Sequence, residues 1–316
     1  MSKVDYPKKA LKRKAGNKHV LWIISALLFL CICFILGKQD DISMRVNHYP
    51  INIKENQVGR RMKGSDIFIV IPSGPEERHF EQRQAIRETW KLDLTRQMNV
   101  TFYVGLKDVP LEMKAKLVSE SVKYKDLVLL ETLSESYTGL TAKMVEIHRH
   151  VVKRYYGIKW VFKTDTDSWI NIKLLVKHLE IPNVKTMLGR ASALHSPVQE
   201  GEQKEYNNVS YPRFNVGAGY AVSYDIIEWV VEQFNRDWFK IFTNEDAALG
   251  IWVSATATNI IHTDRVNSSW DNKFWVENEM LKDCEMDHFV LHYLPAEFVK
   301  RAHRNYKSCE NPCGCK

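Results

Sequence analysis

Two aspartates directly follow a short apolar stretch near the middle of the chain. Asp165 and Asp167 stand two residues apart, after the run WVFK at 160–163, which has the composition of a buried strand. Two carboxylates with this spacing in a turn can share one hard divalent cation. A cation held there can bridge a diphosphate and neutralise the charge that develops when the diphosphate leaves. The spacing alone is a weak signal, because aspartate is also common in turns and as a helix cap.

The position of these aspartates is informative, because ligands in parallel α/β sheets bind beyond the carboxyl ends of the strands. Strands and amphipathic helices alternate from residue 66 onward, which predicts a mostly parallel sheet covered by helices on both faces. Ser73 and Glu76 flank Pro75 in a helix-start pattern, with Ser73 as the cap of a capping box. We expect strands at Asp66–Ile71, Val100–Leu106, Leu127–Leu130 and Trp160–Lys163, and helices after Ser73, at Leu111–Ser121, at Thr138–Tyr156 and near Ile170–Leu179.

The composition and charge of the chain narrow its class. The 316 residues are 45% hydrophobic and 26% charged, which excludes disordered, collagen-like and disulfide-scaffold proteins. The formal net charge is +7, and residues 1–20 hold seven basic side chains and one acid. The rest of the chain, with 38 basic and 37 acidic residues, is nearly neutral. We therefore expect no nucleic-acid partner.

An uncharged segment follows the basic N-terminal tail. Residues 20–36 are seventeen residues with Ser25 as the one polar side chain, the lower limit for a membrane-spanning helix. A cleaved signal peptide is the alternative, although no small-x-small cleavage site follows. Basic residues before the segment and acids after it predict a type II anchor with a cytosolic N-terminus, and a short span suits a Golgi membrane. The expected organisation is a cytosolic tail (1–19), a signal-anchor (20–37), a stem (38–64), an α/β domain (65–300) and a cysteine-bearing tail (301–316).

Two further features agree with a lumenal body. Sequons for N-glycosylation occur at Asn99, Asn208 and Asn267, although one or two are expected by chance in such a length. Four cysteines lie outside the apolar segment, which leaves three pairings open. The CxxxCxC ending could instead hold a metal, but an oxidising lumen favours disulfides. The disulfide candidates are Cys284, Cys309, Cys313 and Cys315.

Several blocks of the sequence resemble one enzyme family in the same order. RQAIRETW at 83–90 resembles the opening motif of the β-1,3-glycosyltransferases (glycosyltransferase family 31), which transfer galactose, N-acetylglucosamine or N-acetylgalactosamine. KTDTDSWIN at 163–171, YPRFNVGAGYAVS at 211–223 and NEDAALGIW at 244–252 match further motifs, and LHYLP at 291–295 resembles the closing one. The similarity spans about residues 66–298, and the ending CENPCGC looks most like the β-1,3-N-acetylgalactosaminyltransferase branch.

The resemblance implies a GT-A type fold, a UDP-sugar donor bound through Mn²⁺ or Mg²⁺, and inversion at the anomeric carbon. By motif, Asp165, Asp167 and His292 would be the metal ligands, and Asp246 would be the general base. An inverting single displacement needs one carboxylate to accept the proton of the attacking hydroxyl, and a mixed oxygen and imidazole set suits Mn²⁺ without excluding Mg²⁺ or Zn²⁺. The donor-binding candidates are Arg83, Arg87, Lys163, Gly217 and Gly219.

Each of these assignments has a plainer alternative. Without the motif, His292 would be read as a packed structural histidine, and Asp246 as an acid favoured by the start of a helix. Arg83 and Arg87 lie four residues apart on one helix face, so either a donor phosphate or a buried acid should lie opposite them. The two glycines could be ordinary turn residues.

The motifs also depart from the family pattern at individual positions. The metal motif usually has aspartate at its centre, where this chain has Thr166, so we expect metal binding that is retained but weaker. Gly139 stands where the family commonly has asparagine, and Ala247 where it commonly has valine.

The leading hypothesis is an inverting β-1,3-glycosyltransferase that moves galactose or N-acetylgalactosamine from a UDP-sugar to a 3-hydroxyl of an acceptor glycan. The alternatives are a catalytically inactive lumenal relative that acts as a chaperone or scaffold, and a sugar-binding module. Expected partners are the UDP-sugar and the acceptor glycan, with one membrane anchor and either a homodimer or a complex with other Golgi transferases.

Overall fold

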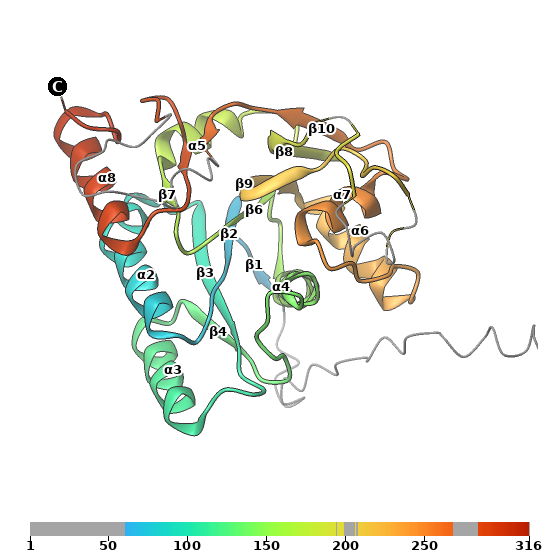
Figure 1. Ribbon diagram of the computed structural model, residues 1–316, viewed down its shortest axis with the longest axis horizontal. Helices are drawn as coiled ribbons and strands as arrows, with labels where there is room; N and C mark the ends of the chain where they lie inside the picture. Colours follow the sequence, from blue (N-terminus) through green and yellow to red (C-terminus); the bar gives the residue numbers. More distant parts are fainter. Residues whose placement is uncertain (1–60, 194, 199–205, 207, 268–283, 316) are drawn as a thin grey trace, which may run out of the picture. The chain divides into compact units, whose positions relative to one another are not determined.

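A seven-stranded sheet forms the centre of the computed structural model, which describes residues 61–193, 195–198, 206, 208–267 and 284–315 (Figure 1). The strand order is β10-β8-β9-β6-β2-β3-β4. All neighbouring strands are parallel except β9, which runs antiparallel to both β6 and β8. The strands are β2 (Ile67–Pro72), β3 (Met98–Gly105), β4 (Leu127–Leu130), β6 (Trp160–Thr164), β8 (Thr186–Ala191), β9 (Asn215–Ser223) and β10 (Asn259–His262). A mostly parallel α/β sheet was expected and is confirmed.

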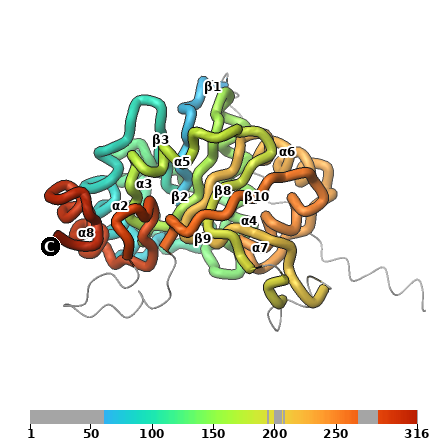
Figure 2. Tube along the Cα trace, turned by 90° about the horizontal axis from the view of Figure 1, so that it is seen from above, coloured from blue at the N-terminus to red at the C-terminus, as the bar shows by residue number. Residues whose placement is uncertain are grey.

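Helices cover both faces of this sheet. Apolar side chains of α2 (Glu77–Glu88), α3 (Leu111–Tyr124), α5 (Ile172–His178) and α8 (Ala296–Cys309) share one core cluster with the strands. The opposite cluster is shared with α4 (Leu140–Arg154), α6 (Tyr224–Asn235) and α7 (Glu245–Val253). Figure 2 shows α8 beside α2, where Lys300 forms an ion pair with Glu88 at 2.9 Å. Because β2 and β6 are buried on both faces, their sequences are continuous apolar runs rather than alternating ones.

Two very short sheets complete the fold. β1 (Met62–Lys63) pairs in parallel with β5 (Tyr155–Tyr156), and this pairing ends α4 at Arg154, two residues before the expected end. The second sheet has the order β11-β12-β7, with β11 at Val266–Asn267, β12 at Val290–Leu291 and β7 at Trp169–Ile170. These two-residue strands lack a periodic signal and were not predicted.

One predicted helix start is wrong. The N-cap of α2 is Glu76, without a side-chain capping bond, whereas a capping box with Ser73 was expected. The backbone N–H of Ser73 instead donates to the carbonyl of Tyr103 at 2.9 Å, so Ser73 continues the pairing of β2 with β3. Its hydroxyl accepts a hydrogen bond from Arg83 Nη1 at 2.8 Å.

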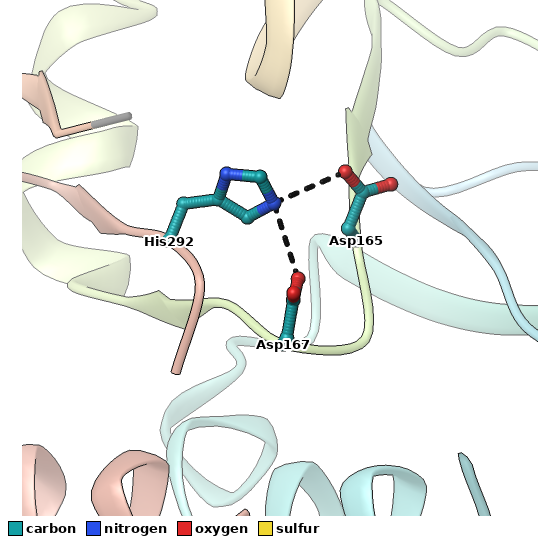
Figure 3. A group of neighbouring side chains, drawn as sticks. All are labelled: Asp165, Asp167 and His292. Carbon is teal, nitrogen blue, oxygen red and sulfur yellow. Dashed lines mark ion pairs between the residues drawn. The ribbon is translucent and has the colours of Figure 1, made fainter. Parts of the chain in front are cut away.

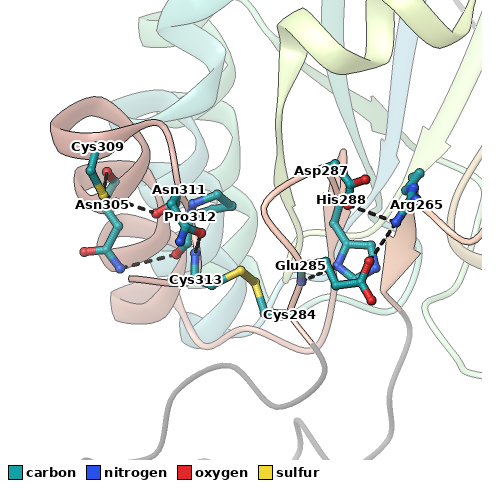
Figure 4. Close-up of a disulfide and its surroundings, with 10 residues drawn as sticks. All are labelled: Arg265, Cys284, Glu285, Asp287, His288, Asn305, Cys309, Asn311, Pro312 and Cys313. Atoms are coloured by element: carbon teal, nitrogen blue, oxygen red, sulfur yellow. Dashed lines mark hydrogen bonds and ion pairs between the residues drawn. A yellow bond between two sulfur atoms is a disulfide. The ribbon is translucent and has the colours of Figure 1, made fainter. Parts of the chain in front are cut away.

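The C-terminal residues belong to the folded body. The boundary drawn at residue 300 falls inside α8, whose Val299 and Ala302 are buried in the core. Of the three open pairings, the structure has Cys284–Cys313 and Cys309–Cys315. Figure 4 shows the first of these bridges, which joins the segment leading into β12 to the residues that follow α8.

The predicted membrane anchor lies outside the described residues. This applies to the cytosolic tail (1–19), the signal-anchor (20–37) and residues 38–60 of the stem. All described residues belong to one compact unit, Tyr49–Lys316. Within the described part of the chain, every helix is too short or too polar to span a bilayer.

Candidate active site

The loop after β6 carries Asp165 and Asp167 to the carboxyl end of the sheet. β6 ends at Thr164, and the chain then turns into β7. β12 pairs antiparallel with β7, with Leu291 opposite Trp169, so the next residue, His292, faces the aspartate loop. The backbone N–H of Leu294 donates to the carbonyl of Asp167 at 2.8 Å, which closes the segment over the loop. The short sheet therefore brings together residues more than a hundred positions apart in the sequence.

His292 lies between the two carboxylates (Figure 3). Its Nε2 is 3.3 Å from Asp165 Oδ2 and 3.1 Å from Asp167 Oδ1. One ligand atom from each of the three residues lies within 4.8 Å of the others. Oxygen or nitrogen ligands about 2.1 Å from an octahedral ion lie about 3 Å apart, so these spacings suit adjacent ligand positions. Two carboxylate oxygens and one imidazole form a set suited to Mn²⁺.

The charges in this cluster stabilise one another. Burial lowers the pKa of His292, but its bonds to Asp165 and Asp167 outweigh burial and raise the pKa to about 9. Burial raises the pKa of Asp165, but the charge of Lys163 and the contact with His292 lower it to about 2. The protonated ring thus stabilises both carboxylates, and a metal held by His292 would have to displace its proton.

Asp246 lies at the start of α7. Asn244 is the N-cap of this helix and accepts from the backbone N–H of Ala247 at 3.0 Å, and Asp246 stands in the first turn, where the plainer alternative also places it. Asp246 Oδ2 accepts from the backbone N–H of Gly217 at 2.6 Å. Its Oδ1 is buried without a hydrogen-bond partner. Burial and the neighbouring charge of Glu245 raise the pKa of Asp246 well above its usual range, and the charge of Lys163 opposes this rise. A raised pKa makes the ionised carboxylate a stronger proton acceptor.

Lys163 connects the two halves of the site. Its ammonium is 2% exposed and lies 3.2 Å from Asp165 Oδ1 and 3.4 Å from Glu245 Oε2. It also donates to the carbonyl of Gly217 at 2.8 Å. Burial lowers the pKa of Lys163, but the charges of Asp165 and Glu245 raise it above its usual value. One buried cation therefore links the aspartate loop, β9 and the start of α7.

Gly217 is required by this close approach. A Cβ at this position would lie 2.7 Å from Asp246 Oδ1 and 2.8 Å from Lys163 Nζ, closer than real Cβ contacts. At Gly219, a Cβ would lie 2.9 Å from Val290 Cγ2, on the short sheet that supports His292. The two glycines therefore serve packing within the site and are not ordinary turn residues.

Arg83 and Arg87 contact buried acids. Arg83 is 0% exposed and donates to both carboxylate oxygens of Glu120, at 2.8 and 2.6 Å. Arg87 donates to Glu120 at 2.7 Å and makes a two-point contact with Asp126 at 3.0 and 2.7 Å. Of the two anions considered opposite these arginines, the structure therefore has the buried acid. This network fixes α2 to α3.

The three sequons lie in different environments. Asn208 is exposed and Asn99 is half-buried. Asn267, in β11, is 3% exposed. Its backbone carbonyl accepts from the N–H of His292 at 3.2 Å.

The sequence interpretation missed two groups around the site. Glu245 was considered only as a helix-start acid, yet it accepts from Tyr220 Oη at 2.7 Å and faces Lys163. His79 and Gln82 of α2 contact the aspartate loop through Thr166. Nothing in the local sequence signals either contact, because the partners are 25 to 87 positions apart.

Comparison with known proteins gives a family match over the centre of the chain. A family model described as galactosyltransferase matches residues 81–264, a range that includes both loop aspartates and Asp246 but ends before His292. The chain is 27% identical over 205 residues to hydroxyproline O-galactosyltransferase GALT5 of Arabidopsis thaliana, covering 58% of this chain and 30% of that protein. It is 27% identical over 209 residues to human UDP-GalNAc:beta-1,3-N-acetylgalactosaminyltransferase 2, covering 65% of this chain and 39% of that protein.

The chain thus spans about a third of the length of these relatives. Among solved structures, a mannosyltransferase from Pyrobaculum calidifontis in complex with GDP-Man and Mn²⁺ aligns with 66% of this chain and 57% of that chain, at 16% identity and a TM-score of 0.39. A likeness this weak carries no argument about this chain's fold or ligands.

Proposed function

The chain belongs to the galactosyltransferase family, and from this premise we propose that it is an inverting β-1,3-glycosyltransferase with a GT-A type fold. It moves a hexose from a UDP-sugar to a 3-hydroxyl of an acceptor glycan. Galactose and N-acetylgalactosamine are the donor sugars that the names of its relatives support. The observation that carries the proposal is the pairing of a three-ligand cluster with a carboxylate of raised pKa, joined by one buried lysine.

The residues divide the reaction between them. Asp165, Asp167 and His292 would hold the divalent cation, which when bound offsets the charge on the leaving diphosphate. Asp246 Oδ1, which has no hydrogen-bond partner in the described structure, accepts the proton of the acceptor hydroxyl. The acceptor oxygen bonds to the anomeric carbon as the bond from that carbon to the UDP oxygen breaks. Lys163 forms ion pairs with Asp165 and Glu245 and so holds these two acids in place.

An inactive scaffold and a sugar-binding module are less well supported. Neither role needs a carboxylate of raised pKa held beside a metal cluster. Both would tolerate loss of Asp246 and the loop aspartates, and this chain has all three.

The purified full-length protein tests the proposal. With Mn²⁺ present, we expect transfer from UDP-galactose or UDP-N-acetylgalactosamine to a glycan acceptor, measured by UDP release and product mass. Asp246→Asn should lower turnover by on the order of 10² to 10⁴ with UDP affinity nearly unchanged, because this residue faces the acceptor. Asp165→Asn should instead abolish Mn²⁺-dependent UDP binding. Retention of more than about a tenth of the turnover in Asp246→Asn would place the base elsewhere.

For localisation, we propose a single-pass type II protein of the Golgi membrane with a lumenal domain. The charge distribution around residues 20–36 supports this orientation, and two disulfides suit an oxidising compartment. Protease added to intact microsomes should leave the domain undigested. Digestion of the domain from outside would refute the orientation.

A further inference from the structure

A threonine stands between the two loop aspartates and faces away from them toward α2. Thr166 is 4% exposed. Its hydroxyl donates to Gln82 Oε1 at 2.8 Å, and its oxygen lies 3.2 Å from His79 Nδ1. His79 and Gln82 are three residues apart on α2, so they lie on the same face of the helix. The hydroxyl is therefore held at two points by one rigid element.

The helix that holds Thr166 is itself fixed. The buried ion pairs of Arg83 with Glu120, at 2.6 Å, and of Arg87 with Asp126, at 2.7 Å, fasten α2 to neighbouring elements. On its other side α2 packs against α8. Because α2 is held in place on both sides, a contact with this helix also fixes the position of the aspartate loop.

The rest of the loop is held from the opposite side. Asp165 is held by Lys163 at 3.2 Å, and the carbonyl of Asp167 accepts from Leu294 N–H at 2.8 Å. Both side chains point toward His292 (Figure 3), while Thr166 between them contacts α2. The bonds of the Thr166 hydroxyl therefore determine how the turn is rotated, and so where the two carboxylates point.

We propose that Thr166 is a positioning residue, which orients Asp165 and Asp167 for a divalent cation through its contacts with His79 and Gln82. This inference rests on the proposed function, because it takes the two aspartates as metal ligands. It assigns a role to the one position of the motif that cannot itself contribute a charged ligand. Groups that hold metal ligands in this way are commonly worth 10- to 100-fold in metal affinity.

Two substitutions at Thr166 separate the effect of the hydroxyl from that of the side-chain volume, and two at other positions serve as controls. Thr166→Val keeps the shape and removes the hydroxyl, and Thr166→Ser keeps the hydroxyl. Thr89→Val is the matched control, because Thr89, the C-cap residue of α2, is 3% exposed and its hydroxyl donates to the carbonyl of Ala85 at 2.6 Å. Gln82→Met removes the acceptor without changing the loop, in case Thr166→Val fails to fold.

The measurement is Mn²⁺ affinity of the full-length protein in the absence of any sugar nucleotide, by titration with electron paramagnetic resonance of free Mn²⁺. We expect Thr166→Val and Gln82→Met to weaken binding by about tenfold or more, and the double variant to be no weaker than Thr166→Val. Thr166→Ser should bind Mn²⁺ within about threefold of the natural protein. The control Thr89→Val should bind Mn²⁺ as tightly as the natural protein. At saturating Mn²⁺, the turnover of Thr166→Val measured by steady-state kinetics should return to most of the value of the natural protein.

The outcomes separate this inference from the proposed function. If the natural protein binds Mn²⁺ and Thr166→Val binds it equally well, the positioning role is refuted and the metal site stands. If the natural protein binds no Mn²⁺ at all, the metal assignment and the positioning role fall together. A loss in Thr89→Val as large as in Thr166→Val would show a general effect of removing a buried hydroxyl, which also overturns the inference.

Discussion

Asp246 depends on a backbone contact that only glycine permits. Its Oδ2 accepts from Gly217 N–H at 2.6 Å, and the same glycine carbonyl accepts from Lys163. Asp246 and Lys163 are therefore both positioned by the backbone of Gly217. This arrangement makes the position of the carboxylate sensitive to a single methyl group.

We expect Gly217→Ala to lower turnover by on the order of 10²-fold, the scale of a misplacement of about 1 Å. The added Cβ would meet Asp246 Oδ1 at 2.7 Å and Lys163 Nζ at 2.8 Å, so both groups must shift. Lys163 also contacts Asp165 at 3.2 Å, so Mn²⁺ affinity should fall as well, but by less than turnover, because Gly217 contacts Asp246 directly. If the effect passes through the base, the variant Gly217→Ala/Asp246→Asn should be no slower than Asp246→Asn alone. Additive losses in the double variant would contradict this account.

At the scale of the element, α4 carries two histidines that burial keeps neutral. His148 is 3% exposed, and burial lowers its pKa to about 4, against a smaller opposing effect of Glu245. Burial and the charge of Arg154 lower the pKa of His150 to about 4 as well. Its Nδ1 is hydrogen-bonded with Tyr103 Oη at 3.1 Å. In the unfolded chain both would titrate near 6.5.

The contribution of these two histidines to the free energy of unfolding should therefore fall as pH decreases from about 6.5 to 4. Over this range the unfolded state binds protons that the folded state does not, at a cost of up to about 1.4 kcal/mol per pH unit for each histidine. Below pH 4 this contribution is constant. His148→Gln should reduce the slope, measured by denaturant unfolding at several pH values between 4 and 7. An unchanged slope would show that His148 is already protonated in the folded state.

The elements differ in how far the sequence predicts them. β2, β4 and β6 are apolar runs and were placed within one or two residues of their bounds. β9 was not identified, because its sequence NVGAGYAVS mixes glycines with apolar residues. The strands that present His292 have two residues each, and they form only through pairing between distant segments.

The residues of the site also differ in how far the sequence predicts them. The aspartate pair could be found from its place after a strand, whereas Asp246 and His292 could be found only from motif similarity. Glu245, Thr166 and His79 could not be assigned, because their roles come from tertiary contacts to Lys163 and α2. Local patterns carry no information about which distant side chain a buried group meets.

At the scale of the whole molecule, one disulfide joins distant segments of the chain and the other closes a short local loop. Cys284–Cys313 spans 29 residues and joins the segment before β12 to the chain after α8. Cys309–Cys315 spans six residues and closes a local ring at the end of α8. The first is therefore placed to hold the segment that presents His292, and the second is not.

We expect Cys284→Ser/Cys313→Ser to lower the free energy of unfolding by about 3 to 4 kcal/mol and Cys309→Ser/Cys315→Ser by about 2 kcal/mol, from the lengths of the closed loops. The first double variant should also weaken Mn²⁺ binding, because His292 follows β12 directly. The second is the matched control, since it removes the same number of cysteines without releasing that segment. Thermal unfolding and Mn²⁺ titration test both, and equal Mn²⁺ affinities in the two variants would contradict the link.

The short sheet β11-β12-β7 also determines where the protein can be cut. The family match ends at residue 264, and β11 and β12 begin after it. A fragment designed to that limit would keep Asp165, Asp167 and Asp246 but lose His292, and it would leave β7 without its partner strand β12. Exposed strand edges recruit other chains and promote aggregation. Such a fragment should express poorly for a reason unrelated to catalysis, whereas one extended through α8 retains the covering strand.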